Sequence, residues 1–327
     1  MLLIISIFIV ATLSNNVLAW GPHTHDSLSN SIFNSDNPIG QLCNSTPENK
    51  AAYELGSVTP DITVIYYYTN GGNDYRLTHN WNFDQEIFAQ ALTDDEKCFA
   101  YGIASHLIAD SIAHTQAVPA GIRASKLPNW VAHPMLEKKY DSYLTLKNPG
   151  LMSSTAHMMD AMYGPKGERY IQMIQNAIGA NSDIDVKANL IQLDTALGGN
   201  SSFYSSQFAP QGQSFIFKLY PYIDKFTNFL APIIGSTNSV KMNNYYDESE
   251  QAILNTFNNW GARYELSPHG FTELSAANQD IGISTTIIII LIFAAPIALA
   301  FVRKNAWYLA FIPLLLIIGV VVAYCIL

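Results

Sequence analysis

The feature that most constrains the fold is a set of polar side chains at helical spacing in an otherwise apolar segment. His106, Asp110 and His114 follow one another at intervals of four residues within residues 101–114. Residues four apart lie on one face of an α-helix on successive turns, so all three side chains are predicted to share a face. Left without partners, each would cost roughly 1–3 kcal/mol on burial. A single histidine here could be a hydrogen-bonded core residue, but imidazole and carboxylate groups together favour a zinc site.

Helical periodicity continues through much of the remaining chain. It predicts amphipathic helices at residues 87–92, 98–113, 135–146, 170–178, 215–230 and 246–260. Asp94, Asp95 and Glu96 precede the long apolar run, where carboxylates oppose the helix dipole and mark a helix start. No sustained alternation of apolar and polar residues demands a sheet. The fold class predicted is therefore all-α, with a single multi-helix domain.

The two ends of the chain carry most of its apolar excess. The whole chain is 49% hydrophobic and only 13% charged. Residues 1–19 are typical of a secretory signal peptide, with an uncleaved anchor as the alternative. Residues 281–302 and 306–327 are each long enough for a transmembrane helix, and Arg303-Lys304 between them favours a cytosolic turn. A glycolipid-anchor signal is the rival explanation of this end. These features predict a multi-pass membrane protein whose domain, residues 20–280, is extracellular or lumenal.

Charge and cysteines further describe the predicted exported domain. Residues 20–280 hold 15 basic and 26 acidic residues, and this acidic balance disfavours nucleic acid as a partner. Cys43 and Cys98 are the natural disulfide pair in an oxidising compartment, whereas Cys325 falls in the last apolar stretch. Asn44 and Asn200 begin glycosylation motifs, which support export.

Four further candidate ligands are ambiguous when taken without the rest of the sequence. His133 and Glu137 repeat the spacing of four, but Pro134 belongs in the first turn of a helix, so the pair could equally be a capping arrangement. Asp61 follows a helix-like stretch and could be a cap or turn residue. His79 follows a loop and could be an exposed loop residue.

Taken in order along the chain, these motifs resemble the zinc-dependent phospholipase C and single-strand nuclease superfamily. The motifs are Trp20-Gly21-Pro22-His23-Thr24-His25, Pro60-Asp61, Thr78-His79, His106-x-x-x-Asp110 and His133-x-x-x-Glu137. The nearest likeness is to the catalytic domain of glycosylphosphatidylinositol-specific phospholipase D, because residues 101–114 match its tyrosine-glycine-isoleucine-x-serine-histidine run. Bacterial enzymes and nucleases of the superfamily place a longer gap before the last histidine.

The resemblance implies three zinc ions. One would be held by Asp61, His79, His106 and Asp110, a second by His114, His133 and Glu137, and a third by Trp20, His25 and the shared Asp110. Trp20 would bind through the free amine and carbonyl oxygen of a processed N-terminus. His23 is the alternative to His25, but its spacing from Trp20 fits the family less well. Asp61 is also the residue expected to serve in catalysis.

The function expected from the residues and the resemblance is hydrolysis of a phosphoric ester. The substrate would be a phosphodiester of a phospholipid or glycolipid anchor at a membrane surface, attacked by a metal-activated water. A single-strand nuclease or phosphatase of the same superfamily is the nearest alternative. A catalytically silent, zinc-stabilised binding module is the alternative from another class, since structural zinc can contribute folding energy without a reaction.

Overall fold

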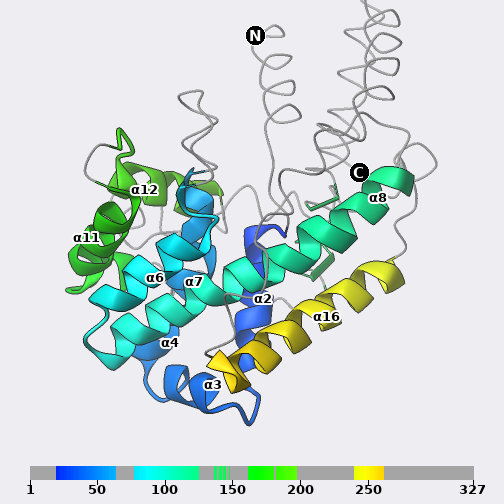
Figure 1. Cartoon of the computed structure of the whole chain (residues 1–327), viewed down its shortest axis with the longest axis horizontal. Helices are drawn as coiled ribbons and strands as arrows, with labels where there is room; N and C mark the ends of the chain where they lie inside the picture. The colour runs from blue at the N-terminus through cyan, green and yellow to red at the C-terminus, as the bar shows by residue number, and fades with distance from the viewer. Residues whose placement is uncertain are drawn as a thin grey trace, which may run out of the picture.

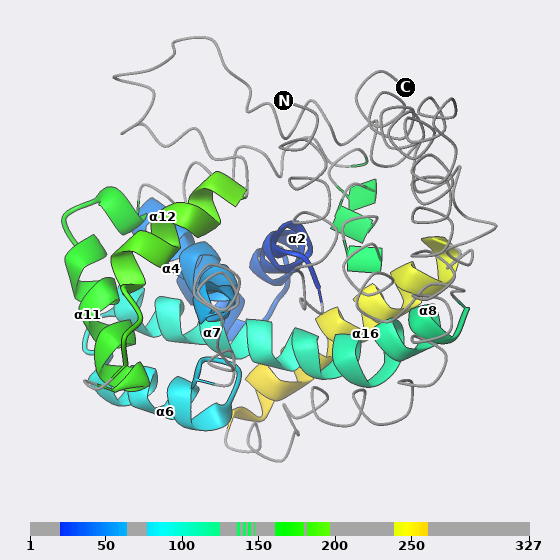
Figure 2. The same cartoon turned by 90° about the horizontal axis from the view of Figure 1, so that it is seen from above.

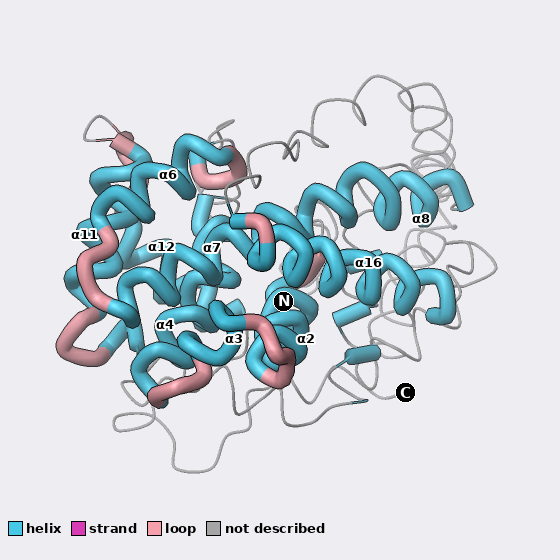
Figure 3. Tube along the Cα trace, turned by 60° about the horizontal axis from the view of Figure 1, so that its bottom comes forward, coloured by secondary structure: helices cyan, strands magenta, loops and turns pink. Residues whose placement is uncertain are grey.

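The computed structural model of the protein describes a helical domain. The described residues are 20–63, 77–124, 161–179, 182–196 and 239–260, together with residues 136, 137, 140, 141, 143, 144 and 147. None of these residues lies in a strand (Figure 3), so the all-α prediction is confirmed for this part of the chain. The elements are α2 (Pro22–Phe33), α3 (Pro38–Cys43), α4 (Pro47–Val58), the 3₁₀ turn η1 (Thr59–Asp61), α6 (Trp81–Gln90), α7 (Asp94–Ile112), the π-helical turn η3 (Ala113–Ala117), α8 (Val118–Ala124), α11 (Gly167–Ile178), α12 (Val186–Ala196) and α16 (Ser239–Asn258).

Helix α7 is the axis of the domain. It begins where the run of carboxylates predicted a helix start, and Thr93 and Glu96 form a capping box there. The helix continues without interruption through η3 into α8, so that residues 94–124 form one long rod (Figure 1). Fifteen of its residues are buried along the α7 portion, because other helices pack around it. The predicted helices at 87–92, 170–178 and 246–260 correspond to α6, α11 and α16, whereas residues 215–230 lie outside the described residues.

Two glycines let α4 approach α7 closely. A Cβ atom on Gly56 would lie 2.0 Å from the carbonyl oxygen of Phe99, and one on Gly102 would lie 2.1 Å from the carbonyl oxygen of Tyr53. Real side chains never approach backbone atoms so closely, so the two backbones meet only because both positions are glycine. This contact fixes the register of α4 against the histidine-bearing part of α7.

Helix α2 lies between α4 on one side and α16 on the other (Figure 2). The Tyr246 hydroxyl of α16 hydrogen-bonds to Ser27 at 2.9 Å and to Ser31 at 3.3 Å, both on α2. Just before α2, the Trp20 indole donates a hydrogen bond to Ser249 of α16. Elements more than 200 residues apart in the sequence therefore enclose the same core.

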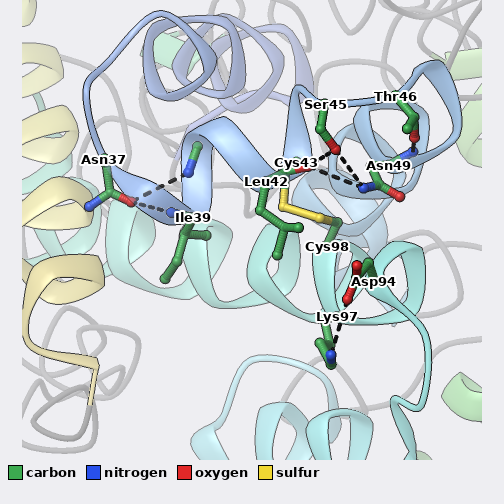
Figure 4. The surroundings of a disulfide bond; sticks show 11 residues. Asn37, Ile39, Leu42, Cys43, Ser45, Thr46, Asn49, Asp94, Lys97 and Cys98 are labelled. Carbon is green, nitrogen blue, oxygen red and sulfur yellow. Dashed lines mark hydrogen bonds and ion pairs between the residues drawn. A yellow bond between two sulfur atoms is a disulfide. The ribbon is translucent and has the colours of Figure 1, made fainter.

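A disulfide joins the end of α3 to α7 (Figure 4). Cys43 and Cys98 are bonded, with their Cα atoms 5.4 Å apart, so the predicted pairing is confirmed. The same view shows Asn37, which caps α3 through its side chain. Asn44, the predicted glycosylation acceptor, is exposed directly after the bridged cysteine, and its modification stays a prediction. Asn200 and Cys325 lie outside the described residues.

The prediction of a multi-pass membrane protein is wrong, because the helices of the described residues contradict it. Within the described ranges, no helix is both long and apolar enough to cross a membrane. The two longest helices there, α7 and α16, carry charged residues such as Asp110 and Asp247 along their length. Residues 1–19, 281–302 and 306–327, which gave the signal-peptide and transmembrane predictions, lie outside the described residues.

Candidate metal centre

Asp110 lies at the centre of a buried group of histidines contributed by separate elements. Its Oδ1 is 3.3 Å from Nε2 of His25 on α2. Its Oδ2 is 3.6 Å from Nε2 of His79, which lies just before α6, and 3.2 Å from Nε2 of His106 on α7. All four side chains are at least 95% buried. One carboxylate thus faces three imidazole nitrogens away from solvent.

Asp61 adds a second carboxylate to the group. Its Oδ1 lies 3.6 Å from Nε2 of His79 and 3.8 Å from Nε2 of His106. Its other oxygen, Oδ2, is buried and accepts no hydrogen bond from the described residues. A buried carboxylate oxygen normally accepts hydrogen bonds or binds a metal. The 3₁₀ turn η1 holds Asp61 at the end of α4, which explains how a turn residue faces the centre.

The imidazole rings of His106 and His79 are oriented by hydrogen bonds from Nδ1, the nitrogen that faces away from the centre. Nδ1 of His106 lies 2.8 Å from the carbonyl oxygen of Ser57, to which it donates as an N–H. Nε2 of His106 is thereby directed into the group, where it donates to Asp110 when it carries a proton and offers a lone pair to a metal when it does not. Nε2 of His106 is 3.2 Å from Nε2 of His79, so two imidazole nitrogens converge on one point. Such convergence suits a bound cation.

The close packing of α4 on α7 accounts for the Ser57 contact. Ser57 is adjacent to Gly56, and the Cβ position of Gly102 would lie 2.8 Å from the Ser57 nitrogen. The two glycines therefore bring the end of α4 against the turn that carries His106. Neither Ser57 nor the glycines were predicted from the sequence as parts of the site, although Gly102 belongs to the motif quoted above.

The pKa of Asp110 is set by two opposing effects. Burial alone would raise the pKa of this carboxyl group. The charge and hydrogen bond of His106, together with the hydrogen bond of His25, outweigh burial and hold the pKa well below its usual range. Asp110 is therefore ionised, as a metal ligand must be.

His114 lies at the edge of this group. The sequence predicts it one helical turn after Asp110, but α7 ends at Ile112 and His114 belongs to the π-helical turn η3. Its Nε2 is 3.9 Å from Oδ2 of Asp110, the longest of the four histidine contacts to that residue. A π-turn widens the local backbone and is frequent at functional sites. The shared face of His106, Asp110 and His114 is thus preserved across a change of helix type.

The other predicted site residues occupy different positions. Trp20 is fully buried, with its ring 5.1 Å from that of Tyr140. Glu137 is buried in a helical stretch, and His133 lies outside the described residues. His23 is buried on α2, but His25 is the α2 histidine seen 3.3 Å from Asp110.

Two overlapping sets of these residues could hold a metal ion. They are His25, Asp61 and His106, and His79, His106 and Asp110, and the ligand atoms within each set lie within 4.8 Å of one another. Imidazole nitrogen and carboxylate oxygen are among the usual ligands of zinc. The donor set therefore fits the metal that the sequence predicts.

An all-helical domain with a buried centre of histidines and aspartates is the arrangement that the resemblance to zinc hydrolases predicts. Residues 23–183 match the family model of zinc dependent phospholipase C, and the predicted resemblance to that family is confirmed for this segment. No curated protein and no solved structure matches the chain. The nearer likeness to glycosylphosphatidylinositol-specific phospholipase D therefore stays a prediction.

Proposed function

We propose that the protein is a zinc-dependent hydrolase that cleaves a phosphodiester of a phospholipid or glycolipid. The observation that carries the proposal is the convergence of three imidazoles and two carboxylates on a buried point in a chain that matches this family over residues 23–183. When bound, zinc supplies a Lewis acid for a phosphoryl oxygen and activates water for attack. The matched family is one of phospholipases, which supports the lipid substrate.

The residues proposed to hold zinc are those of the three predicted sets. Asp61, His79, His106 and Asp110 form the first set, and the pairwise distances among them of 3.2–3.8 Å support it. His25 with Asp110 supports a second position, completed in our proposal by the Trp20 amine and carbonyl. His114 with His133 and Glu137 is proposed as the third set.

Within this centre, the chain's own groups have distinct tasks. Asp110 contacts histidines from three elements and would neutralise part of the charge of more than one ion. Asp61 carries a buried oxygen without a hydrogen bond from the described residues, so we propose it as the group that holds or accepts a proton of the attacking water. The imidazoles of His79 and His106 are directed by partners outside the centre and would hold its geometry.

The test uses the full chain, with zinc content measured by atomic spectroscopy. Hydrolysis is then measured on phosphatidylcholine vesicles, on a glycolipid-anchored protein and on single-stranded DNA. We expect bound zinc and cleavage of a lipid phosphodiester. Asp110→Asn should lose zinc and lower hydrolysis at least about a hundredfold. Asp185→Asn, an exposed change outside the centre, should leave both unchanged.

The alternatives predict different results in the same measurements. Cleavage of DNA without cleavage of lipid would show a nuclease. Bound zinc without hydrolysis of any of the three substrates would show a zinc-stabilised binding module. A wild-type chain that binds no zinc would contradict every one of these functions.

A further inference from the structure

The carboxylate of Asp141 caps the first turn of helix α2 at Thr24, a residue 117 positions before it in the sequence. Gly21 is the N-cap residue of α2, and it has no side chain that could accept a hydrogen bond from the first turn. Pro22, the first residue of the helix, has no N–H to donate. Oδ1 of Asp141 instead accepts hydrogen bonds from the Thr24 backbone N–H at 3.0 Å and from the Thr24 hydroxyl at 2.8 Å. Asp141 is fully buried. A distant side chain thus performs the capping that an N-cap residue normally provides.

Gly21 leaves the space that this carboxylate occupies. A Cβ atom at Gly21 would lie 2.0 Å from Oδ2 and 2.4 Å from Cγ of Asp141. The φ angle of Gly21 is −69°, which any residue adopts, so glycine is needed here for space. Gly21 therefore leaves room for the Asp141 carboxylate, and Thr24 donates two hydrogen bonds to it.

The capped turn carries a candidate ligand. His25 directly follows Thr24, its Nε2 is 3.3 Å from Asp110, and its ring stacks on that of His106 with centroids 3.9 Å apart. A small movement of the first turn of α2 would displace this imidazole. A negative charge at a helix start also interacts favourably with the helix dipole.

Asp141 also belongs to the segment that carries Glu137. Residues 137 and 141 are both helical and are four apart in the sequence. One carboxylate therefore connects the start of α2, with His25, to the segment with another candidate ligand.

We propose that Asp141 is a positioning residue for the metal centre, which fixes His25 by holding the first turn of α2. The inference rests on the proposed function, since it concerns zinc at that centre. Removing a residue that orients a metal ligand typically lowers metal affinity by about 10–100-fold. We expect an effect of this size on the zinc ion that His25 contacts.

The test compares two buried helix caps in the full chain. Asp141→Ala removes the side-chain acceptor for Thr24 and leaves the bond from the Thr24 N–H to the Gly21 carbonyl oxygen at 2.9 Å. Asn37→Ala is the matched control, because Asn37 is also buried and its Oδ1 accepts N–H groups of Ile39 and Gly40 at 2.9 and 3.3 Å, in a helix without candidate ligands. Zinc affinity is measured by chelator competition, and the ligand field is followed by the absorption spectrum of the cobalt-substituted protein.

Asp141→Ala should lower the affinity of one zinc ion about 10–100-fold and change the cobalt spectrum. Asp141→Asn keeps an acceptor oxygen for Thr24 and should recover part of that affinity. Asn37→Ala should lower the melting temperature but leave zinc affinity and spectrum unchanged. A folded Asp141→Ala chain with wild-type zinc affinity and cobalt spectrum overturns the inference.

Thr24→Val provides a second test if Asp141→Ala does not fold, because it removes only the hydroxyl donor and keeps the shape. Weaker zinc binding is expected, and wild-type affinity in a folded Thr24→Val chain overturns the inference. Failure of the proposed function is distinguishable, since a wild-type chain without zinc overturns both. A zinc-loaded wild-type chain that hydrolyses no phosphodiester overturns the function alone.

Discussion

At the scale of single residues, two histidines of the centre are oriented by different kinds of partner. The His106 ring donates to a main-chain carbonyl, that of Ser57. The His79 ring has its Nδ1 3.3 Å from the Thr78 hydroxyl, which itself donates to the carbonyl oxygen of Pro60 at 2.6 Å. With that hydroxyl proton directed to Pro60, the Thr78 oxygen accepts from Nδ1 of His79 and from the Thr63 hydroxyl 2.5 Å away. His79 therefore depends on a side chain that can be removed by substitution.

Thr78→Val should weaken zinc binding about tenfold, because it keeps the side-chain shape and removes the acceptor that orients His79. Thr78→Ser keeps the hydroxyl and should restore binding. Thr256→Val is a matched control, since the buried Thr256 hydroxyl of α16 bonds to the Ala252 carbonyl at 2.7 Å. Chelator competition measures all three variants. Equal zinc affinity in Thr78→Val and the wild type would rule out this orienting role.

At the scale of elements, the contact between α4 and α7 couples helix packing to the centre. Gly102 lies one turn before His106 and faces the backbone of α4 at Tyr53 and Ser57. Any side chain there must separate the two helices. The separation would also lengthen the hydrogen bond from His106 to Ser57, which is 2.8 Å in the structure.

Gly102→Ala should therefore lower stability by about 1–3 kcal/mol and also weaken zinc binding. Gly167→Ala is a control for the loss of stability caused by a packing clash alone. Gly167 lies in α11, away from the centre, and a Cβ atom there would lie 1.6 Å from the Met162 carbonyl oxygen. Urea unfolding of both variants and zinc titration separate the two effects. Loss of zinc affinity in Gly167→Ala to the same degree would show that destabilisation alone explains the result.

A second element contact fastens α11 to the start of α7. Asp95 interacts with Lys166 at 2.5 Å and accepts a hydrogen bond from the Tyr170 hydroxyl at 2.8 Å. Arg169 pairs with Glu96 at 2.9 Å. Burial alone would raise the pKa of Asp95, but the hydrogen bonds from Lys166 and Tyr170 outweigh it and leave the pKa below its usual value.

A lowered pKa in the folded state means that Asp95 contributes stability above its unfolded pKa of about 4 and loses it as pH falls through the folded value. Asp95→Asn should therefore lower the free energy of unfolding by about 1 kcal/mol at pH 7. The figure is modest because Lys166 is half exposed. The difference in unfolding free energy between wild type and Asp95→Asn should shrink near pH 3. Urea unfolding at both pH values measures it. Asp94→Asn, in an exposed pair with Lys97, should show no resolvable difference, and a constant gap between wild type and Asp95→Asn would refute the linkage.

The elements also show why some of the centre was predictable from the sequence. His106 and Asp110 share a turn of α7, so local spacing alone placed them together. Asp61 and His79 lie in a 3₁₀ turn and before α6, and their positions depend on contacts such as Thr78 with Pro60 that no local pattern marks. Only the family resemblance singled them out. Asp141 was missed because its role exists only once residues 117 apart meet.

At the scale of the whole molecule, the core extends past the family match. That match ends at residue 183, yet Ile253 and Phe257 of α16 are buried in the same core as α2, α4 and α7. Ser249 of α16 accepts the Trp20 indole N–H at 3.1 Å. The last described helix therefore anchors the first described residue, which is also a proposed zinc ligand.

Because the Trp20 ring is held by α16 and Tyr140, its main chain can be altered without moving the ring. If cleavage after Ala19 frees Trp20, its amine, with an unperturbed pKa of roughly 8, must lose a proton to bind zinc, which zinc itself favours. One residue added before Trp20 would convert that amine into an amide nitrogen, a very poor ligand. The extended protein should fold, contain less zinc and hydrolyse little substrate.

Trp20→Phe is the complementary variant, because it keeps the amine and removes the indole N–H that bonds to Ser249. It should cost about 1–3 kcal/mol of stability, from the lost hydrogen bond and the smaller buried ring, while zinc content is retained. Mass spectrometry confirms the N-terminus of each protein, atomic spectroscopy counts zinc and urea unfolding measures stability. Undiminished zinc and turnover in the extended protein would show that Trp20 serves the fold through its ring alone.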